Sequence, residues 1–543
     1  MEVISLYNGQ KSAIFQPAKD YSSASAIYMQ TRKPLFKGEK KNNLNIGVKG
    51  GSFSTINPSL LWEHRFNERI SSSISTEYMY TSGRYKFTYA KKDGYDTTAV
   101  RQNGDVRMLR LENAFFGKVP KGEWKAKAYL YNSERGYPGA AVREEPGKFR
   151  HQDRQWDTNL FVQGSFQNYF KPWYSLLANG KYAYDYLHYL SDPRLDVTTM
   201  YVDNHYRQQE IYASAAHLFT IYPWWSMSLS NDFQWNALRA DLIDFVYPTR
   251  NTILTSAATS FDFNRLMLQA SLLYTHVDDN TRTKGANAGT KNKYTPSVIA
   301  TWQPLTKLPL NVRAFYKKVF RMPTLNDLYY TFIGNKDLKP EYTTQYDVGI
   351  TFSHTWNNHW LKSLDLQIDG YYNEVDDKII AMPTSNQFRW TMINLGHVEI
   401  RGLDAAIRGE WGFGKVELST LFNYTYQKAQ DFTDPTSEWY GGQIPYIPWH
   451  GGSIILNGSY QTWSCNYSFI YTGERYEAVA NIPENYAQPW YTHDFSLSKT
   501  FQWEKTRIRV TAEINNIFNQ QYEVVQCYPM PGTSFKIKLN VML

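Results

Sequence analysis

Long hydrophobic runs are missing from this sequence. A membrane-spanning helix needs roughly 20 predominantly apolar residues in a row, and no stretch of the 543 residues provides them. The first ten residues, MEVISLYNGQ, also lack the basic start and apolar core of a secretory signal peptide. The mean hydropathy is −0.54. These features exclude a bundle of transmembrane helices. They leave strands open, because a spanning strand needs only about 10 residues with every second one apolar.

Cysteine and one-sided charge are scarce as well. The two cysteines, Cys465 and Cys527, are too few for a disulfide framework. We expect no disulfide between them, because Cys465 falls on the apolar face of a predicted strand and Cys527 in a long connection. The formal net charge of +8 comes from 58 basic and 50 acidic residues spread along the chain. Nucleic-acid recognition needs basic residues clustered on one element, so we expect no nucleic-acid partner.

A catalytic arrangement is not recognisable either. The 11 histidines are scattered, and no Ser/His/Asp-type group emerges from the pattern. We therefore expect no catalytic residues, no cofactor and no enzymatic activity.

Period-two alternation, by contrast, is abundant. In residues 462–472, apolar and aromatic side chains alternate with polar ones, and Ile470 is the one exception. Residues 507–515 and 535–543 alternate in the same way. One apolar and one polar face are typical of a strand in a membrane barrel, but also of a half-buried soluble strand. We expect Lys538 to face the lumen. The apolar side chains that we expect to face lipid are Trp463, Cys465, Tyr467, Phe469, Tyr471, Ile508, Val510, Phe535 and Ile537.

The connections between these strands decide between a membrane barrel and a soluble sheet, because they alternate in length. Tight turns are predicted near 66–69, 119–122, 168–172, 220–224, 261–264, 304–308, 357–361, 411–414, 459–462 and 502–505. Longer connections are predicted near 82–104, 134–155, 188–204, 237–250, 276–291, 321–343, 376–392, 428–444, 473–488 and 518–532, and a short one near 54–56 breaks the order. Short turns on one side and long loops on the other are typical of an outer-membrane barrel. The aromatic share of 16% fits the girdles of such a barrel.

The predicted fold is therefore all-β. It is a transmembrane antiparallel up-and-down β-barrel of about 22 strands, over residues 43–543. The expected location is the bacterial outer membrane, with its lipid as a partner.

Three stretches of the chain resemble the TonB-dependent receptor family. Residues 320–329, FRMPTLNDLY, followed by Asn335 and residues 338–341, LKPE, are similar to a segment between two central strands of that family. Residues 394–404 are similar to its N-x-G-x-x-x-x-x-G-L-[ED] strand. Residues 515–519, NNIFN, with Tyr522 and the following Pro-x-Pro-Gly, resemble its C-terminal motif, although Thr533 replaces the usual Arg.

The first 36 residues resemble the end of the family's plug domain. Residues 2–9 and 24–31 are similar to its last strands, with Ala and Ser in place of the usual glycines in the second. The resemblance thus implies a remnant of the plug in 1–36, a linker in 37–42 and the barrel from 43. It further implies that the rest of the plug, with the segment that binds the TonB-type energy transducer, lies outside this chain. We would then expect the 543 residues alone to form a large, weakly selective pore that cannot couple transport to energy.

The resemblance implies energy-dependent import of a scarce nutrient, such as a siderophore, haem or a cobalamin-like chelate. A passive porin, a surface-binding barrel, or a truncated receptor without active transport remain alternatives. Porins have about 16–18 strands, which disfavours the first of these. Ligand contacts are expected from long loops and the upper lumen, although packing in the interface girdle or in the loops is the stronger explanation for any single residue. The candidates are aromatic and basic: Tyr137, Arg143, Tyr201, Tyr329, Tyr330, Arg389, Trp390, Trp439, Tyr440, Arg475 and Tyr476.

Two acidic clusters have the composition of cation sites. They are His276 with Asp278 and Asp279, and Glu374 with Asp376 and Asp377, the second resembling a feature that recurs in the family. A charged, solvated loop explains the first group, and a calcium role for the second is the weaker interpretation. We therefore predict no metal ligands.

Overall fold

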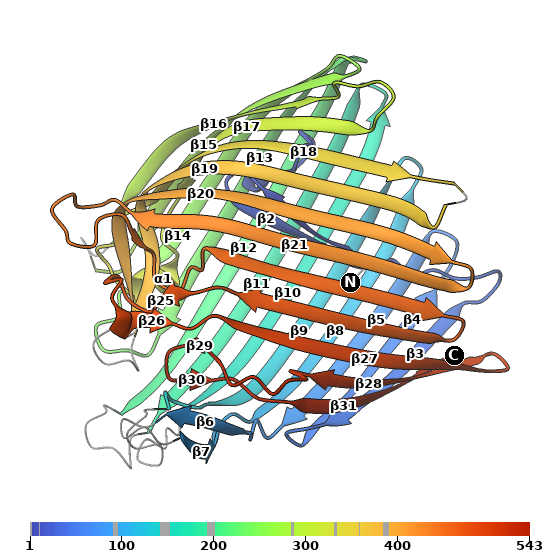
Figure 1. Ribbon diagram of the computed structural model, residues 1–543. Coiled ribbons are helices and arrows are strands. Elements are labelled where there is room, and N and C mark those ends of the chain that lie inside the picture. The colour runs from blue at the N-terminus through green and yellow to red at the C-terminus, as the bar shows by residue number, and fades with distance from the viewer. Residues whose placement is uncertain are drawn as a thin grey trace.

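The computed structural model describes residues 3–9, 11–90, 96–141, 153–192, 201–283, 287–330, 334–357, 359–383 and 390–543. Its main body is a closed antiparallel barrel of 22 strands (Figure 1). Each strand pairs with the next one in the chain, and β31 pairs with β3 to close the sheet, so that Ile46 lies opposite Val541. The predicted fold class and strand number are confirmed.

The barrel strands follow one another along the chain. They are β3 (Asn42–Gly51), β4 (Thr55–Arg65), β5 (Ile70–Thr81), β8 (Val106–Val119), β9 (Gly122–Tyr137), β10 (Asp153–Lys171), β11 (Tyr174–Ser191), β12 (Val202–Tyr222), β13 (Trp225–Ala240), β14 (Thr249–Asp262), β15 (Leu266–Asn280), β16 (Thr290–Trp302), β17 (Leu310–Arg321), β18 (Glu341–Thr355), β19 (Leu361–Pro383), β20 (Trp390–Phe413), β21 (Val416–Asp431), β23 (His450–Tyr460), β24 (Trp463–Thr472), β27 (Trp490–Trp503), β28 (Thr506–Asn515) and β31 (Ser534–Met542). The two-residue β22 (Gly442–Gln443) extends the sheet beside the end of β21.

The remaining elements lie in the connections or ahead of the barrel. Two-stranded hairpins are formed by β6 (Lys86–Ala90) with β7 (Asp96–Val100), β25 (Arg475–Tyr476) with β26 (Tyr486–Ala487), and β29 (Glu523–Val525) with β30 (Tyr528–Pro529). The helices are η1 (Ala18–Tyr21), α1 (Leu325–Tyr329) and η2 (Pro483–Asn485). Among the described residues, no helix is both long and apolar enough to cross a bilayer.

The two ends of the barrel differ as the sequence predicts. Every predicted tight turn joins two neighbouring strands at one end, and the long connections lie at the other end (Figure 1). One boundary differs: β19 and β20 contain 23 and 24 residues and pair as far as Pro383 and Trp390, inside the predicted loop 376–392. Their pairing continues beyond the about 10 residues that a membrane crossing needs, so these strands extend above the bilayer.

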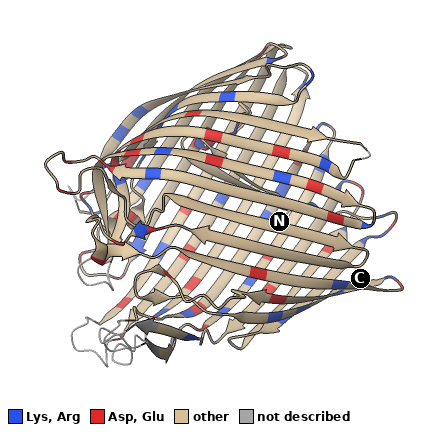
Figure 2. Ribbon diagram, viewed as in Figure 1, with Lys and Arg blue, Asp and Glu red and all other residues tan. Residues whose placement is uncertain are grey.

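The predicted faces of the last strands are confirmed by register. Ile537 lies opposite both Gly50 and Ala512, and its side chain is 63% exposed on the outer surface. Lys538 lies opposite Lys49, whose ammonium group is 3.1 Å from the carboxylate of Glu513 inside the barrel. Lipid therefore meets the apolar set and the lumen meets the polar set. Figure 2 shows basic and acidic residues interspersed over the whole barrel.

Aromatic rings collect at the end with tight turns. Trp224 stacks on Tyr222 with ring centroids 5.5 Å apart. It also stacks on Trp225 of the same turn and on Phe261 and Phe263 of the neighbouring turn. Such rings suit the membrane–water boundary, where one side of the ring meets lipid and the other meets water. This belt marks the end of the barrel that the tight turns assign to the periplasm.

The N-terminal segment lies inside the barrel. Strands β1 (Val3–Asn8) and β2 (Ser25–Gln30) pair antiparallel, and η1 lies between them in sequence (Figure 1). Ile14, Ala18 and Tyr21 pack on inward-facing side chains of β14 and β15, among them Leu254 and Leu273. The segment thus has a small apolar interface with the wall of the lumen.

Candidate ligand-binding vestibule

The connection between β17 and β18, which the structure describes over residues 322–330 and 334–340, lies at the end with long loops and contains α1. Thr324 and Asp327 form a capping box at its start: Thr324 Oγ1 accepts from the Asp327 N–H at 3.1 Å, and Asp327 Oδ2 accepts from the Thr324 N–H at 2.8 Å. This reciprocal pair satisfies two backbone donors that a helix start leaves free. A helix of one turn can therefore persist here.

A buried ion pair fixes the beginning of this connection. Arg250 of β14 donates to both carboxylate oxygens of Asp279 on β15, at 2.5 and 2.6 Å, and its third donor group reaches the carbonyl of Pro323 at 2.6 Å. Planar, bidentate pairing of this kind holds a guanidinium in one orientation. Further along, the Asn335 side chain donates to the carbonyl of Met392 at 2.9 Å.

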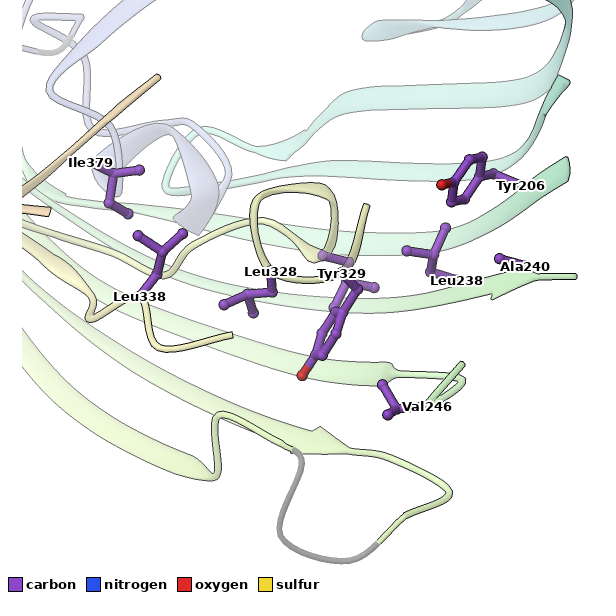
Figure 3. Close-up of a cluster of buried hydrophobic side chains, with 9 residues drawn as sticks. Tyr206, Leu238, Ala240, Val246, Leu328, Tyr329, Leu338 and Ile379 are labelled. Carbon is purple, nitrogen blue, oxygen red and sulfur yellow. The ribbon is translucent and has the colours of Figure 1, made fainter. Parts of the chain in front are cut away.

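An apolar cluster holds α1 against the inner wall (Figure 3). Leu328 and Tyr329 of the helix lie beside Tyr206 and Leu238, which come from β12 and β13. The remaining buried members are Ala240, Val246, Leu325, Leu338 and Ile379. Because β12 and β13 are several strands away from β17, the connection packs along the inner wall well beyond its own neighbouring strands. We call the lumen beside this connection, at the end with long loops, the vestibule.

Two of the predicted ligand-contact residues, Tyr329 and Tyr330, lie in this cluster. Tyr329 is buried, whereas Tyr330 is half-buried and its ring lies 4.4 Å from that of Tyr206. Burial raises the pKa of Tyr330 to about 12, so its hydroxyl stays neutral at physiological pH. Tyr330 therefore offers a neutral, half-buried ring with a hydroxyl group beside the lumen, whereas Tyr329 packs beneath it in the cluster.

A second group forms around Tyr446, which the sequence did not suggest. Its ring lies 6.1 Å from that of the predicted Trp390, and its N–H donates to the carbonyl of Tyr476 at 2.8 Å. The Tyr476 ring meets Tyr486 edge-on at 6.0 Å. Tyr446 thus contacts both Trp390 and Tyr476, which are distant from each other in sequence.

Arg475 lies beneath this second group as a tie between loops. Arg475 is 3% exposed, and its guanidinium donates to the carbonyls of Gln488, Glu523 and Val524 at 2.9–3.1 Å. Burial lowers its pKa. In this structure the guanidinium stabilises two loops through its hydrogen bonds.

The other candidates are dispersed. Tyr137 faces the lumen at the end of β9 and donates to Gln155 Oε1 at 2.8 Å. Trp439 and Tyr440 lie in the β21–β22 connection, where the Tyr440 ring meets Phe432 edge-on at 5.2 Å. Tyr201 precedes β12 and approaches Asp203 on the outer surface. Arg143 and Arg389 lie outside the described residues.

The acidic clusters considered from sequence do not converge. Asp279 is held inside by Arg250, whereas His276 and Asp278 bond to Asn292 and Thr290 on the other face of their strand. In the second group, Asp376 pairs with His397 at 2.8 Å, Asp377 approaches Lys339 at 3.8 Å, and Glu374 accepts from Tyr372 at 3.1 Å. Each carboxylate thus has a partner of its own.

The comparisons with known proteins agree with this architecture. Residues 42–517 match the family described as "TonB dependent receptor-like, beta-barrel". The chain belongs to this family. The members of this family and the solved structures described next are receptors and transporters of the outer membrane. The predicted outer-membrane location is therefore confirmed, and so is the prediction of a receptor or transporter in place of an enzyme.

Individual relatives of this receptor barrel are distant. The vitamin B12 transporter BtuB of Photobacterium profundum is 28% identical over 244 residues, which are 43% of this chain and 36% of that transporter. A probable hemoglobin and hemoglobin-haptoglobin-binding protein of Haemophilus influenzae is 26% identical over 25% of this chain and 15% of that protein. The matched part of this chain thus spans well under two thirds of either relative.

Solved structures share the fold of this receptor barrel. The FrpB iron transporter of Neisseria meningitidis superposes with a TM-score of 0.75 at 12% identity, over 100% of this chain and 87% of that chain. The siderophore receptor PiuA of Acinetobacter baumannii gives 0.75 at 12%, over 99% and 86%.

Below the vestibule of this receptor barrel lies a cavity between the N-terminal hairpin and the wall. Its volume is about 1260 Å³. Its lining is strongly charged and includes Lys127, Glu112, Arg110, Lys181 and Glu210. Lys127 pairs with Glu112 at 2.8 Å and Lys181 with Glu210 at 2.9 Å. The lumen is therefore polar but locally neutralised.

Sequence reasoning missed Tyr206 and Tyr446. Tyr206 could have been found from alternation, since it shares a face with the lumen residue Tyr212 on β12. Tyr446 lies in an irregular connection and has φ of 60°, and no local pattern in the sequence marks it.

Proposed function

We propose that this chain is the ligand-binding barrel of a receptor for TonB-dependent import of a compact nutrient, of the siderophore, haem or cobalamin type. The observation that carries the proposal is the loop 322–340, which brings Tyr329 and Tyr330 onto the inner wall beside Tyr206. Small-molecule sites combine aromatic walls with a few placed polar groups, and the half-buried Tyr330 provides a ring and a hydroxyl group. The relatives named as a vitamin B12 transporter and a siderophore receptor support the same ligand class.

The proposed partners follow from family membership and the surface. A TonB-type transducer would supply the energy, and outer-membrane lipid would surround the apolar face. Residues 1–36 are proposed to be the last part of a plug domain. Their packing against the wall through Ala18 and Tyr21 supports this assignment.

Binding by the purified, folded chain tests the proposal. Cyanocobalamin, haemin and a ferric catecholate are titrated separately, with tryptophan fluorescence and calorimetry as readouts. Tyr330→Ala should weaken binding of the recognised probe about tenfold or more, because a half-buried aromatic anchor is removed. The matched control is Tyr294→Ala, a tyrosine 66% exposed on the outer face. No binding of any probe, or equal loss in both variants, would contradict the proposal.

A further inference from the structure

A cluster of histidine and carboxylate side chains lies on the outer surface, away from the vestibule. His188 of β11 lies directly opposite His205 of β12. Their neighbours Leu187 and Tyr206 point into the lumen cluster, so both imidazoles point outward. Asp203 follows the same alternation as His205, which places all three side chains on one face.

The ligand atoms converge. One nitrogen or oxygen from each of His188, Asp203 and His205 lies within 4.8 Å of the others. His188 Nε2 is 2.7 Å and His205 Nε2 is 3.6 Å from Asp203 Oδ1. A second carboxylate, Asp241, places Oδ2 3.8 Å from His205 Nε2. Ligands bound to one zinc ion at about 2.0–2.2 Å lie at comparable separations from one another.

The surrounding groups orient these side chains. The Tyr186 hydroxyl bonds to His205 Nδ1 at 2.7 Å, which leaves Nε2 directed at the carboxylates. Asp241 Oδ1 accepts from the backbone N–H of His205 at 2.8 Å, which leaves Oδ2 available to a bound ion. The Trp156 ring stacks on His188 at 4.5 Å. A hydrogen bond to the second nitrogen of a histidine is the usual support of a metal ligand.

The height of the cluster makes it accessible. His188 lies fourteen residues along β11 from Tyr174, at the end with tight turns. At about 3.3 Å per residue and a tilt of about 45°, this is roughly 33 Å above the turns, beyond an apolar band of about 25 Å. The side chains of His188, His205 and Asp203 are 21%, 34% and 41% exposed. A cation from the medium can reach them at the level of the lipid headgroups.

We propose that His188, Asp203, His205 and Asp241 form a surface site for a divalent transition-metal ion of the Zn²⁺ class. Imidazole ligands favour Zn²⁺, Ni²⁺ and Cu²⁺ over Ca²⁺ and Mg²⁺, which prefer oxygen ligands only. The two imidazoles are now stacked with centroids 4.0 Å apart and planes at 11°. A shared ion must lie near the plane of each ring, so binding rotates them out of this stack and changes the contact with Trp156.

The test uses the full chain in detergent, titrated with ZnCl₂ and in parallel with CaCl₂. Calorimetry should show one Zn²⁺ site per chain and no competition by an equal concentration of Ca²⁺. His205→Gln should weaken Zn²⁺ binding at least about 30-fold, and Tyr186→Phe, which removes only the positioning hydroxyl, about tenfold. The matched control is His493→Gln: this outward histidine also bonds a tyrosine, Tyr467, at 2.7 Å, but faces Phe469 across the strand instead of a second histidine.

A second measurement needs no variant. Zn²⁺ should protect His188 and His205, but not His493, from carbethoxylation by diethylpyrocarbonate, as read by mass spectrometry. Equal protection of all three, no heat on Zn²⁺ addition, or unchanged affinity in His205→Gln would overturn the proposal.

Discussion

The ammonium group of Lys317 lies 2.7 Å from the carbonyl oxygen of Ser23, and this contact joins the barrel wall to the N-terminal segment. Lys317 is 1% exposed and also donates to the carbonyl of Gly9 at 3.2 Å. Gly9 has φ of +78°, and a Cβ there would lie 2.7 Å from the Phe315 ring, so only glycine fits above this wall. One lysine on β17 thus holds the chain just after β1 and just before β2, at the end of the hairpin where Asn8 pairs with Ser25.

Lys317→Met should release this segment. The substitution keeps the length of the side chain but removes both hydrogen bonds, each worth about 1.5–3 kcal/mol when the donor is charged. Because burying the ammonium is itself costly, the net destabilisation of docking should be smaller, about 1–3 kcal/mol. Hydrogen exchange of Val3–Asn8 and Ser25–Gln30 should quicken about 5- to 150-fold. The neighbouring Lys318→Met, at an exposed position on the outer face, should leave this exchange unchanged.

Docking of the segment should also depend on pH through Asp20. Burial raises the pKa of Asp20 above its ordinary value of 3.8, and the hydrogen bond from the Tyr28 hydroxyl opposes this only in part. Asp20 binds its proton more tightly when docked than when released. Docking is therefore strongest below about pH 4 and weakens as pH rises through the raised pKa.

Protease cleavage within residues 11–24, measured at pH 4.5 and pH 7.5 with an acid-active and a neutral enzyme calibrated on unfolded chain, checks this sign. The fraction of accessible chain should be lower at pH 4.5, and Asp20→Asn should flatten the dependence. Lys11 and Lys19, on the same segment, and Asp232, on β13, also act on Asp20. Looser docking at pH 4.5 in the wild type would show that another group governs the response.

The Arg250–Asp279 pair should be the most sensitive point of the vestibule. The two side chains are 9% and 2% exposed, and removing one partner of a buried pair typically costs about 3–5 kcal/mol because the other charge is left uncompensated. Asp279→Leu should lower the free energy of unfolding by about this amount in urea titrations of the barrel folded into vesicles. The double variant Arg250→Met/Asp279→Leu should recover part of the loss. If the double variant lost as much free energy of unfolding as the two single variants together, energetic coupling between Arg250 and Asp279 would be excluded.

Much of the fold is readable from the sequence because the bilayer imposes a simple rule. A strand such as β28 must alternate between lipid and water, so Ile508, Val510 and Ala512 fall on one face whatever their partners are. The tight turns follow from short, polar breaks in this alternation, and their order fixes the strand number. The ends of β19 and β20 were not predictable. Above the membrane both faces of a strand meet water, so alternation of apolar and polar residues no longer distinguishes a paired strand from a loop.

The candidate site was only partly predictable for a related reason. Tyr329 and Tyr330 were found because they follow a recognisable motif, but their partner Tyr206 lies on a distant strand. The pairing of Arg250 with Asp279 and of His188 with His205 depends on register, which is fixed by the whole closed sheet. No local window of sequence contains that information.

The outer face itself yields the last prediction. Val510 lies on β28 opposite Leu539 on one side and Lys499 on the other, four residues above the turn that begins β28. Val510→Arg should be destabilising in urea titrations of the barrel folded into lipid vesicles, since a charge would enter the apolar band, by up to the about 2–4 kcal/mol that a basic residue costs at the bilayer midplane. Repulsion from Lys499, which lies over the Trp463 ring at 4.3 Å, should add to this cost. Lys538→Ala, on the lumen face of the neighbouring strand, should cost far less. Equal costs for the two variants would show that the lipid and lumen faces are reversed.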